Sequence, residues 1–248
     1  MENQLREYIL MMADNVMVLG QRLGEWCGHG PVLEQDIAMT NFALDLIGEA
    51  RNYYQYLAET DGKSEDEYPM KRDVRAFKNI LLTELPNGHW GDTIMRQFMF
   101  DCYHYYLLEG MISSKDDRLA AIAKKSFKEA TYHLAFSSEW VIRLGDGTEK
   151  SHHKMQQSLD DLMPYFNEMF IPESYETWCY EQKIAPSLEG VKSSAYEKFN
   201  TIIADATLQI PENIFSKKGG KSGFHTENLG FILADMQYLQ RSYPGVVW

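Results

Sequence analysis

Three residues of this chain have the types and spacing of metal ligands: Asp101, His104 and His133. Asp101 and His104 stand three positions apart in the apolar run 98–104. His133 lies in a second helical run, residues 127–144. Side chains three apart share one helix face, and a carboxylate among apolar neighbours is costly unless it is paired, hydrogen-bonded or bound to metal. The set therefore suggests part of a carboxylate-bridged di-iron site, with a hydrogen-bonded polar seam as the alternative.

A complete di-iron site in a four-helix bundle needs more ligands than these three. It takes a glutamate from each of two helices and a Glu-x-x-His pair from each of the other two. Three residues before His133, where the carboxylate of such a pair belongs, stands Ala130. The helix expected over residues 32–59 contains no histidine, and three residues after its best-placed carboxylate, Asp45, stands Gly48. The usual ligand set therefore cannot be assembled.

The first helix offers Asp14 and Asn15 near its middle, and an asparagine is not a bridging ligand. We therefore predict no metal site and no catalytic residue in this chain. The vestigial ligand positions are Asp45, Asp101 and His133, with His104 nearby. A partial or single-metal site built from the same residues is the alternative. In the predicted metal-free state the leftover polar groups bond to one another, because buried polar groups are normally satisfied.

Composition excludes several classes of protein. The 248 residues are 44% apolar and 13% aromatic, which indicates a globular chain, and we expect one domain over residues 1–248. The net charge of −12 argues against binding to nucleic acid or to anionic membrane surfaces. Three scattered cysteines make neither a disulfide framework nor a zinc site. With no signal peptide and no long apolar run, we expect a cytoplasmic protein.

Apolar residues recur at helical spacing throughout, and no alternating strand of useful length is found. We therefore predict an all-α fold with four core helices and a C-terminal helical elaboration over residues 150–248. The core helices are expected at about 3–26, 32–59, 90–113 and 116–144. Outside the core, a polar linker is expected at 61–69, loop with some short helix at 171–190, and further helices at about 72–84, 155–169, 188–208 and 229–239.

A loop rich in lysine and glycine, residues 217–223, stands out in this acidic chain. Lys217, Lys218 and Lys221 could approach a phosphate, and the glycines would let backbone N–H groups do the same. The spacing of a P-loop is absent. A solvated flexible loop is the default interpretation, and a contact with a phosphate-bearing ligand or an acidic partner is the alternative.

Several stretches along nearly the whole chain share a family pattern. They are residues 21–29, 44–52, 86–88, 92–104, 129–134, 143–148, 154–157, 225–230 and 236–241, with Pro244, Gly245 and Trp248 at the end. In this combination the chain resembles the PaaC family, the structural subunits of the bacterial ring 1,2-phenylacetyl-CoA epoxidase (phenylacetate-CoA oxygenase) complex, a multicomponent monooxygenase of aerobic phenylacetate breakdown.

The resemblance implies a ferritin-like four-helix bundle and a non-catalytic subunit. It also implies that the di-iron centre is held by a PaaA-like catalytic partner, that other oxygenase and reductase subunits deliver electrons from NADPH, and that this chain holds no cofactor of its own. At the positions that hold the metal ligands in the family's di-iron site, this chain has Asn15, Asp45, Gly48, Asp101, Ala130 and His133. The lysines of the 217–223 loop would then be candidates for contacts with the phosphates of coenzyme A.

Two other interpretations stay open. The chain could itself be a di-iron oxygenase with an unusual ligand set, or it could be an all-α interaction module unrelated to oxygenation. The leading interpretation is a subunit that braces the catalytic subunit through a large helix-on-helix interface, as obligate pairs do. For the chain in isolation, a homodimer is an open alternative.

Overall fold

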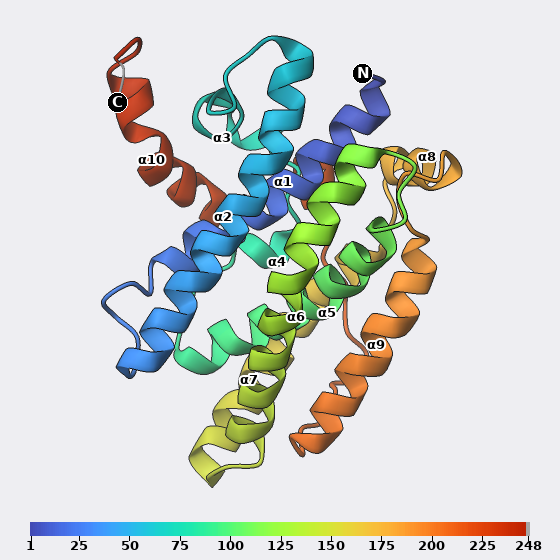
Figure 1. The fold of residues 1–248 in the computed structure, drawn as a ribbon. Helices are drawn as coiled ribbons and strands as arrows, with labels where there is room; N and C mark the ends of the chain where they lie inside the picture. The colour runs from blue at the N-terminus through green and yellow to red at the C-terminus, as the bar shows by residue number, and fades with distance from the viewer. Residues whose placement is uncertain (247–248) are drawn as a thin grey trace. The chain divides into compact units, whose positions relative to one another are not determined.

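The computed structural model describes residues 1–246, and within them it is built from helices without a β-strand (Figure 1). The α-helices are α1 (Asn3–Gly24), α2 (Leu33–Asp61), α3 (Glu67–Lys71), α4 (Leu81–Glu84), α5 (Trp90–Met111), α6 (Asp117–Gly145), α7 (Glu149–Phe166), α8 (Ser174–Glu181), α9 (Leu188–Asp205) and α10 (Glu227–Ser242). The 3-10 helices are η1 (Val74–Ala76), η2 (Asn167–Phe170) and η3 (Gly220–Ser222). The predicted all-α class is confirmed. No helix among these residues is long and apolar enough to cross a bilayer.

The chain divides into two compact units. Unit 1 comprises residues 1–86 together with the chain from Gly219 onward, and unit 2 comprises Asn87–Lys218. The expectation of one ferritin-like domain stays a prediction. Trp248, which belongs to the family pattern, lies outside the described residues.

Helical periodicity placed the four long helices to within a few residues, as α1, α2, α5 and α6. The helix predicted over 72–84 is wrong. That stretch holds only η1 and α4, and between them Phe77 and Ile80 have extended backbone. The predicted linker 61–69 also contains the first residues of α3. Local propensity is overridden in this stretch by buried polar side chains, which bind its backbone.

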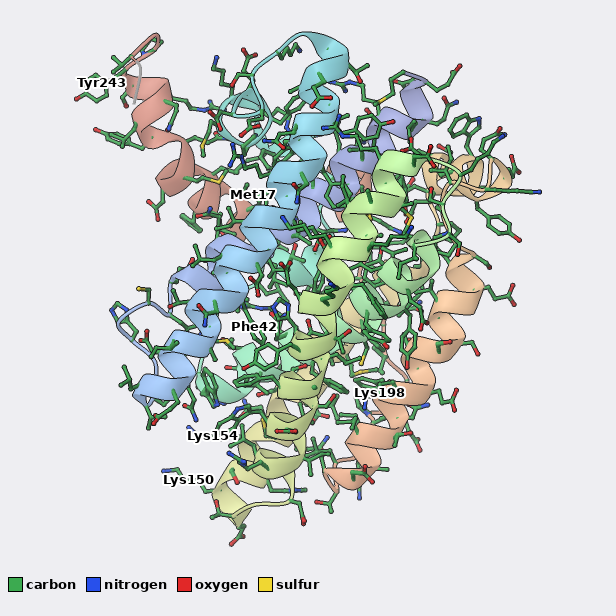
Figure 2. All side chains as sticks on the ribbon, viewed as in Figure 1. Met17, Phe42, Lys150, Lys154, Lys198 and Tyr243 are labelled. Atoms are coloured by element: carbon green, nitrogen blue, oxygen red, sulfur yellow. The ribbon has the colours of Figure 1, made fainter. Side chains whose placement is uncertain are left out.

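In unit 1, α1 and α2 pack side by side as a helical hairpin. Gly20 of α1 permits their close approach, because a Cβ there would lie 2.9 Å from Ile47 Cγ1 and 3.2 Å from the carbonyl oxygen of Ala43. Met17 on α1 and Phe42 on α2, both labelled in Figure 2, are among the buried side chains of this unit.

Asp14 is a fully buried carboxylate in the middle of α1. Its Oδ1 accepts hydrogen bonds from the Tyr54 hydroxyl (2.7 Å) and from the Arg72 guanidinium. Its Oδ2 accepts from Arg72 Nη1 (3.0 Å) and from the backbone N–H of Lys78 (2.9 Å). Burial alone would lower the pKa of Arg72, but the Asp14 charge raises it above its ordinary value. One side chain thus fastens α2 and the 72–78 segment to α1.

A second buried carboxylate, Glu84, joins the C-terminal segment to unit 1. Its Oε2 lies 2.9 Å from His225 Nδ1, and its Oε1 accepts from the backbone N–H of Thr226 at 2.6 Å. The other ring nitrogen of His225 lies 3.0 Å from the Phe77 carbonyl oxygen. Burial would lower the pKa of His225, but these hydrogen bonds and the charges of Glu84 and Asp14 raise it above its usual value. Both ring nitrogens face acceptors, so the geometry favours the doubly protonated ring.

The last helix, α10, packs on unit 1 through a small apolar cluster. The cluster contains Val18, Phe77, Leu229, Ile232 and Leu233, with Val74 and Met236 against it. Gln237 Nε2 adds hydrogen bonds to the carbonyl oxygens of Pro69 (2.8 Å) and Arg72 (2.9 Å). Apolar contacts and hydrogen bonds to the backbone therefore hold α10 against the rest of the unit.

Unit 2 is organised around α5, which contacts α6, α7 and α9. Its start is fixed by a capping box between His89 and Asp92. The other oxygen of Asp92 accepts a hydrogen bond from Ser158 of α7 at 2.6 Å. Between α5 and α9, the rings of Phe98 and Phe199 stack with centroids 5.8 Å apart. Polar and aromatic contacts together hold α5 in place, and α5 carries Asp101 and His104.

We predict that Asp14→Ala destabilises the fold by about 3–5 kcal/mol, because removing one partner leaves the buried charge of Arg72 uncompensated. Urea unfolding followed by circular dichroism measures the effect. Lys71→Ala is the matched control, because Lys71 forms an exposed ion pair with Glu67 at 3.6 Å, and its loss should change stability by less than about 0.5 kcal/mol. Equal effects of the two substitutions would contradict the central role assigned to Asp14.

Candidate functional site

Asp101 lies on the face of α5 that meets α6, and it is 2% exposed. Its Oδ1 accepts a hydrogen bond from Gln97 Nε2, one turn earlier in α5, at 2.7 Å. Its Oδ2 accepts a hydrogen bond from the Ser137 hydroxyl of α6, also at 2.7 Å. Each oxygen of this carboxylate therefore has a donor from the protein itself. This is the polar-seam arrangement that the sequence left as an alternative to a metal ligand.

His104 and His133 are both buried, one on α5 and the other on α6. The His104 ring packs against Phe100 with centroids 5.0 Å apart. Burial raises the pKa of Asp101 to about 6, while His133, the Ser137 and Gln97 hydrogen bonds and His104 act in the opposite direction. The structure thus brings the three predicted residues into one electrostatically coupled cluster.

The cluster does not have the arrangement of a metal centre. Among residues 1–246, no group of three or more His, Cys, Asp or Glu side chains is placed to hold a metal ion. Ala130, at the register position one turn before His133, offers no ligand atom. What the cluster can do chemically is hold a proton on Asp101 near pH 6 and join α5 to α6 by hydrogen bonds.

Three of the expected ligand positions, Asn15, Asp45 and Gly48, lie in unit 1. Asn15 Oδ1 accepts a hydrogen bond from the backbone N–H of Ile80 at 2.8 Å. Asp45 is half-buried on α2, and a Cβ at Gly48 would meet nothing within 4 Å. The residues present at these positions do not match the donor set that a di-iron centre requires. The description of Asp45, Asp101 and His133 as vestigial ligands stays a prediction.

Sequence reasoning missed the partners of Asp101. Gln97 stands four residues before Asp101, a spacing at which helical side chains meet, and this signal could have been used. Ser137 could not have been found in the same way, because a serine hydroxyl on α6 carries no distinguishing pattern. The Glu84–His225 contact was also missed, because 141 positions separate the two residues and no local spacing links them.

The glycines of the lysine and glycine loop pack closely against another segment of unit 1. A Cβ at Gly220 would lie 2.3 Å from the Asn79 carbonyl oxygen, and one at Gly223 would lie 2.5 Å from that of Arg75. Gly219 and Gly223 also have positive φ, at 132° and 83°, which favours glycine. The close backbone approach that glycine permits is therefore made to residues 75–81 of the same unit.

The three lysines of this loop do not share one environment. Lys217 and Lys218 are exposed, and Lys217 Nζ donates a hydrogen bond to the Tyr165 hydroxyl at 2.8 Å. Lys221 is 2% exposed. Its ammonium group is therefore not exposed at the surface. A phosphate contact made by all three lysines would require it to be exposed. A phosphate contact of Lys217 and Lys218 stays a prediction.

We predict that Asp101→Asn changes the pH dependence of stability. The native pKa of about 6 lies above the ordinary 3.8, so the native state binds this proton more tightly than the unfolded state. Ionisation of Asp101 therefore costs stability as the pH rises through this window, and the cost is constant above it. Relative to wild type, the asparagine variant should gain on the order of 2 kcal/mol between about pH 4 and about pH 7.5.

Urea unfolding at a series of pH values measures this difference. Ser138→Ala, which removes a buried hydroxyl from the same region of α6 but no titrating group, is the control and should keep the wild-type pH profile. Parallel pH profiles for wild type and Asp101→Asn would contradict the raised pKa.

We predict opposite effects for alanine at two glycines of unit 1. Gly220→Ala should destabilise the fold by about 1–3 kcal/mol, because the methyl group would overlap the Asn79 carbonyl. Gly230→Ala, in α10 with nothing within 4 Å of the added Cβ, should raise stability by about 0.5–1 kcal/mol through helix propensity. Thermal unfolding measures both, and a harmless Gly220→Ala would show that the loop is not packed as described.

Comparison with known proteins agrees with the pattern in the sequence. The family model described as phenylacetic acid catabolic protein matches residues 1–248. The PaaC subunit of the 1,2-phenylacetyl-CoA epoxidase of Escherichia coli (strain K12) is 46% identical over 247 residues, which are 99% of this chain and 100% of the relative. The resemblance inferred from the sequence is thereby confirmed. This chain belongs to the phenylacetic acid catabolic protein family.

Proposed function

We propose that this chain is the structural, PaaC-type subunit of a ring 1,2-phenylacetyl-CoA epoxidase of aerobic phenylacetate catabolism. In this role it adopts the ferritin-like four-helix arrangement and braces a catalytic di-iron subunit without turning over substrate itself. The family membership and the PaaC relative, aligned over its whole length, support the assignment. We expect the assembly to work in the cytoplasm with the remaining oxygenase and reductase subunits.

The observation that carries the non-catalytic part of the proposal is the bonding of Asp101. Oδ1 and Oδ2 of Asp101 accept hydrogen bonds at 2.7 Å from Gln97 and Ser137, so side chains of the chain itself compensate the burial of this carboxylate. Asn15 and Ala130 stand at two further register positions and supply no carboxylate. The donor set therefore fits a bundle held by hydrogen bonds better than one held by iron. The iron that oxygen activation requires would be bound by the partner.

We predict that the purified chain contains far less than one iron per molecule and does not epoxidise phenylacetyl-CoA, even when the reductase and NADPH are supplied. Co-expression with the catalytic subunit of the same complex should yield a stable assembly that contains about two irons per catalytic chain and is active. Elemental analysis, light scattering and product analysis measure these quantities.

Each rival function has its own outcome in this experiment. About two irons per isolated chain, with turnover, would make the chain itself an oxygenase. Failure to assemble with the catalytic subunit would instead favour an unrelated interaction module. Either result would overturn the proposal.

A further inference from the structure

The outer face of α2 carries an exposed apolar stripe. Leu33 is 71% exposed, Ile37 51% and Leu44 63%. These positions and Gly48 fall within about 60° of one another around a helix of 3.6 residues per turn. Buried side chains of α2, such as Met39 and Leu46, lie on the opposite side of the helix.

The stripe is suited to contact with another helix. It extends about 16 Å along α2, from Leu33 to Leu44, at 1.5 Å per residue. At Gly48 the space above the backbone is open, since an added Cβ would meet nothing within 4 Å. Aliphatic side chains followed by an uncovered glycine form a surface on which the side-chain ridge of a second helix can pack. Exposed aliphatic side chains gathered on one face are typical of an interaction site.

The charges beside the stripe have one sign. Glu34 and Asp45 flank it on one side and Asp36 on the other, by their positions around the helix. Residues 23–50 as a whole contain five acidic residues and no lysine or arginine. The nearest basic residue after the stripe, Arg51, is paired with Glu65 at 2.6 Å. The stripe is therefore apolar at Leu33, Ile37 and Leu44, with the polar Thr40 and Asn41 between the last two, and it is acidic along its edges.

We propose that this stripe is the docking surface for a helix of the catalytic partner subunit. The apolar face of that helix would be flanked by lysine or arginine. The inference rests on the function proposed above. Charge complementarity selects this occupant over a second copy of the chain, because a two-fold contact places the same patch on both sides of the interface. Pairing the stripe with itself would bring the acidic edges of two chains of charge −12 together, and like charges so placed disfavour association.

The test compares substitutions at two exposed apolar sites of unit 1. The double variant Ile37→Glu/Leu44→Glu places two carboxylates on the stripe, and we expect it to weaken binding to the catalytic subunit about 100-fold or more. Phe231→Glu is the matched control, because Phe231 is 64% exposed on α10, and its affinity should stay within about twofold of wild type. Calorimetric titration gives the dissociation constants.

Two additional variants sharpen the test. Ile37→Ala/Leu44→Ala removes the apolar side chains while keeping good helix formers, and it should weaken binding about 10-fold even if the glutamate variant fails to fold. Glu34→Gln should weaken binding and reduce its salt dependence, because the acidic edge faces basic groups of the partner. Circular dichroism checks that each variant is folded.

Each result decides a different question. Unchanged affinity of both double variants, with wild type binding normally, would overturn this surface assignment and leave the proposed function standing. If Phe231→Glu abolishes binding while the stripe variants bind normally, the partner contacts α10, and the assignment of the stripe is also overturned. A homodimer in light scattering that the stripe variants disrupt, with binding to the catalytic subunit intact, would assign the stripe to a second copy. No binding by wild type would defeat the proposed function itself.

Discussion

The buried carboxylate of Asp14 is the constraint on which the N-terminal unit depends. A charge without solvent must be matched by donors from the protein, and those donors come from three places along the chain: Tyr54, Arg72 and the backbone of Lys78. Because the N–H of Lys78 is used in this way, it is not available to a helix. The extended backbone at Phe77 and Ile80 accompanies these contacts, together with the hydrogen bond from the Ile80 N–H to Asn15.

The same segment then determines where the C-terminal part of the unit goes. Extended backbone after η1 directs the Phe77 carbonyl to one ring nitrogen of His225, while Glu84 in α4 meets the other. Arg22 of α1 binds the Glu84 carbonyl oxygen at 3.1 Å and 3.0 Å. Polar contacts therefore continue from α1 through α4 to the start of α10. The glycines at 220 and 223 complete this contact, since only a residue without a side chain fits so close to the 75–81 backbone.

These dependencies explain what the sequence could and could not predict. The long helices follow from apolar periodicity, a local property that survives in the fold, and so α1, α2, α5 and α6 were predicted correctly. The segment 72–84 was not, because its conformation is set by Asp14 and Asn15, which lie about 60 positions earlier in the chain. The site was predicted in part: spacing placed Asp101 and His104 together, but not Ser137, the residue that gives Asp101 a donor on α6.

Asp14 and Asp101 show two ways in which this chain holds a buried carboxylate by hydrogen bonds. Asp14 receives its donors from α2 and the 72–78 segment, whereas Asp101 receives one from its own helix and one from α6. Asn15 likewise accepts a hydrogen bond from the backbone of Ile80. The two carboxylates differ in charge balance. Asp14 has the guanidinium of Arg72, whereas neutral donors, Gln97 and Ser137, bind Asp101.

Burial raises the pKa of Asp101 to about 6, and His133, the hydrogen bonds from Ser137 and Gln97, and His104 offset only part of that effect. An iron ion at Asp101 would supply the missing positive charge and hold the carboxylate ionised. Without such a charge, the carboxylate is held by hydrogen bonds and its proton affinity rises. The pKa of about 6 therefore reflects a buried carboxylate whose hydrogen bonds from Gln97 and Ser137 offset only part of the effect of burial.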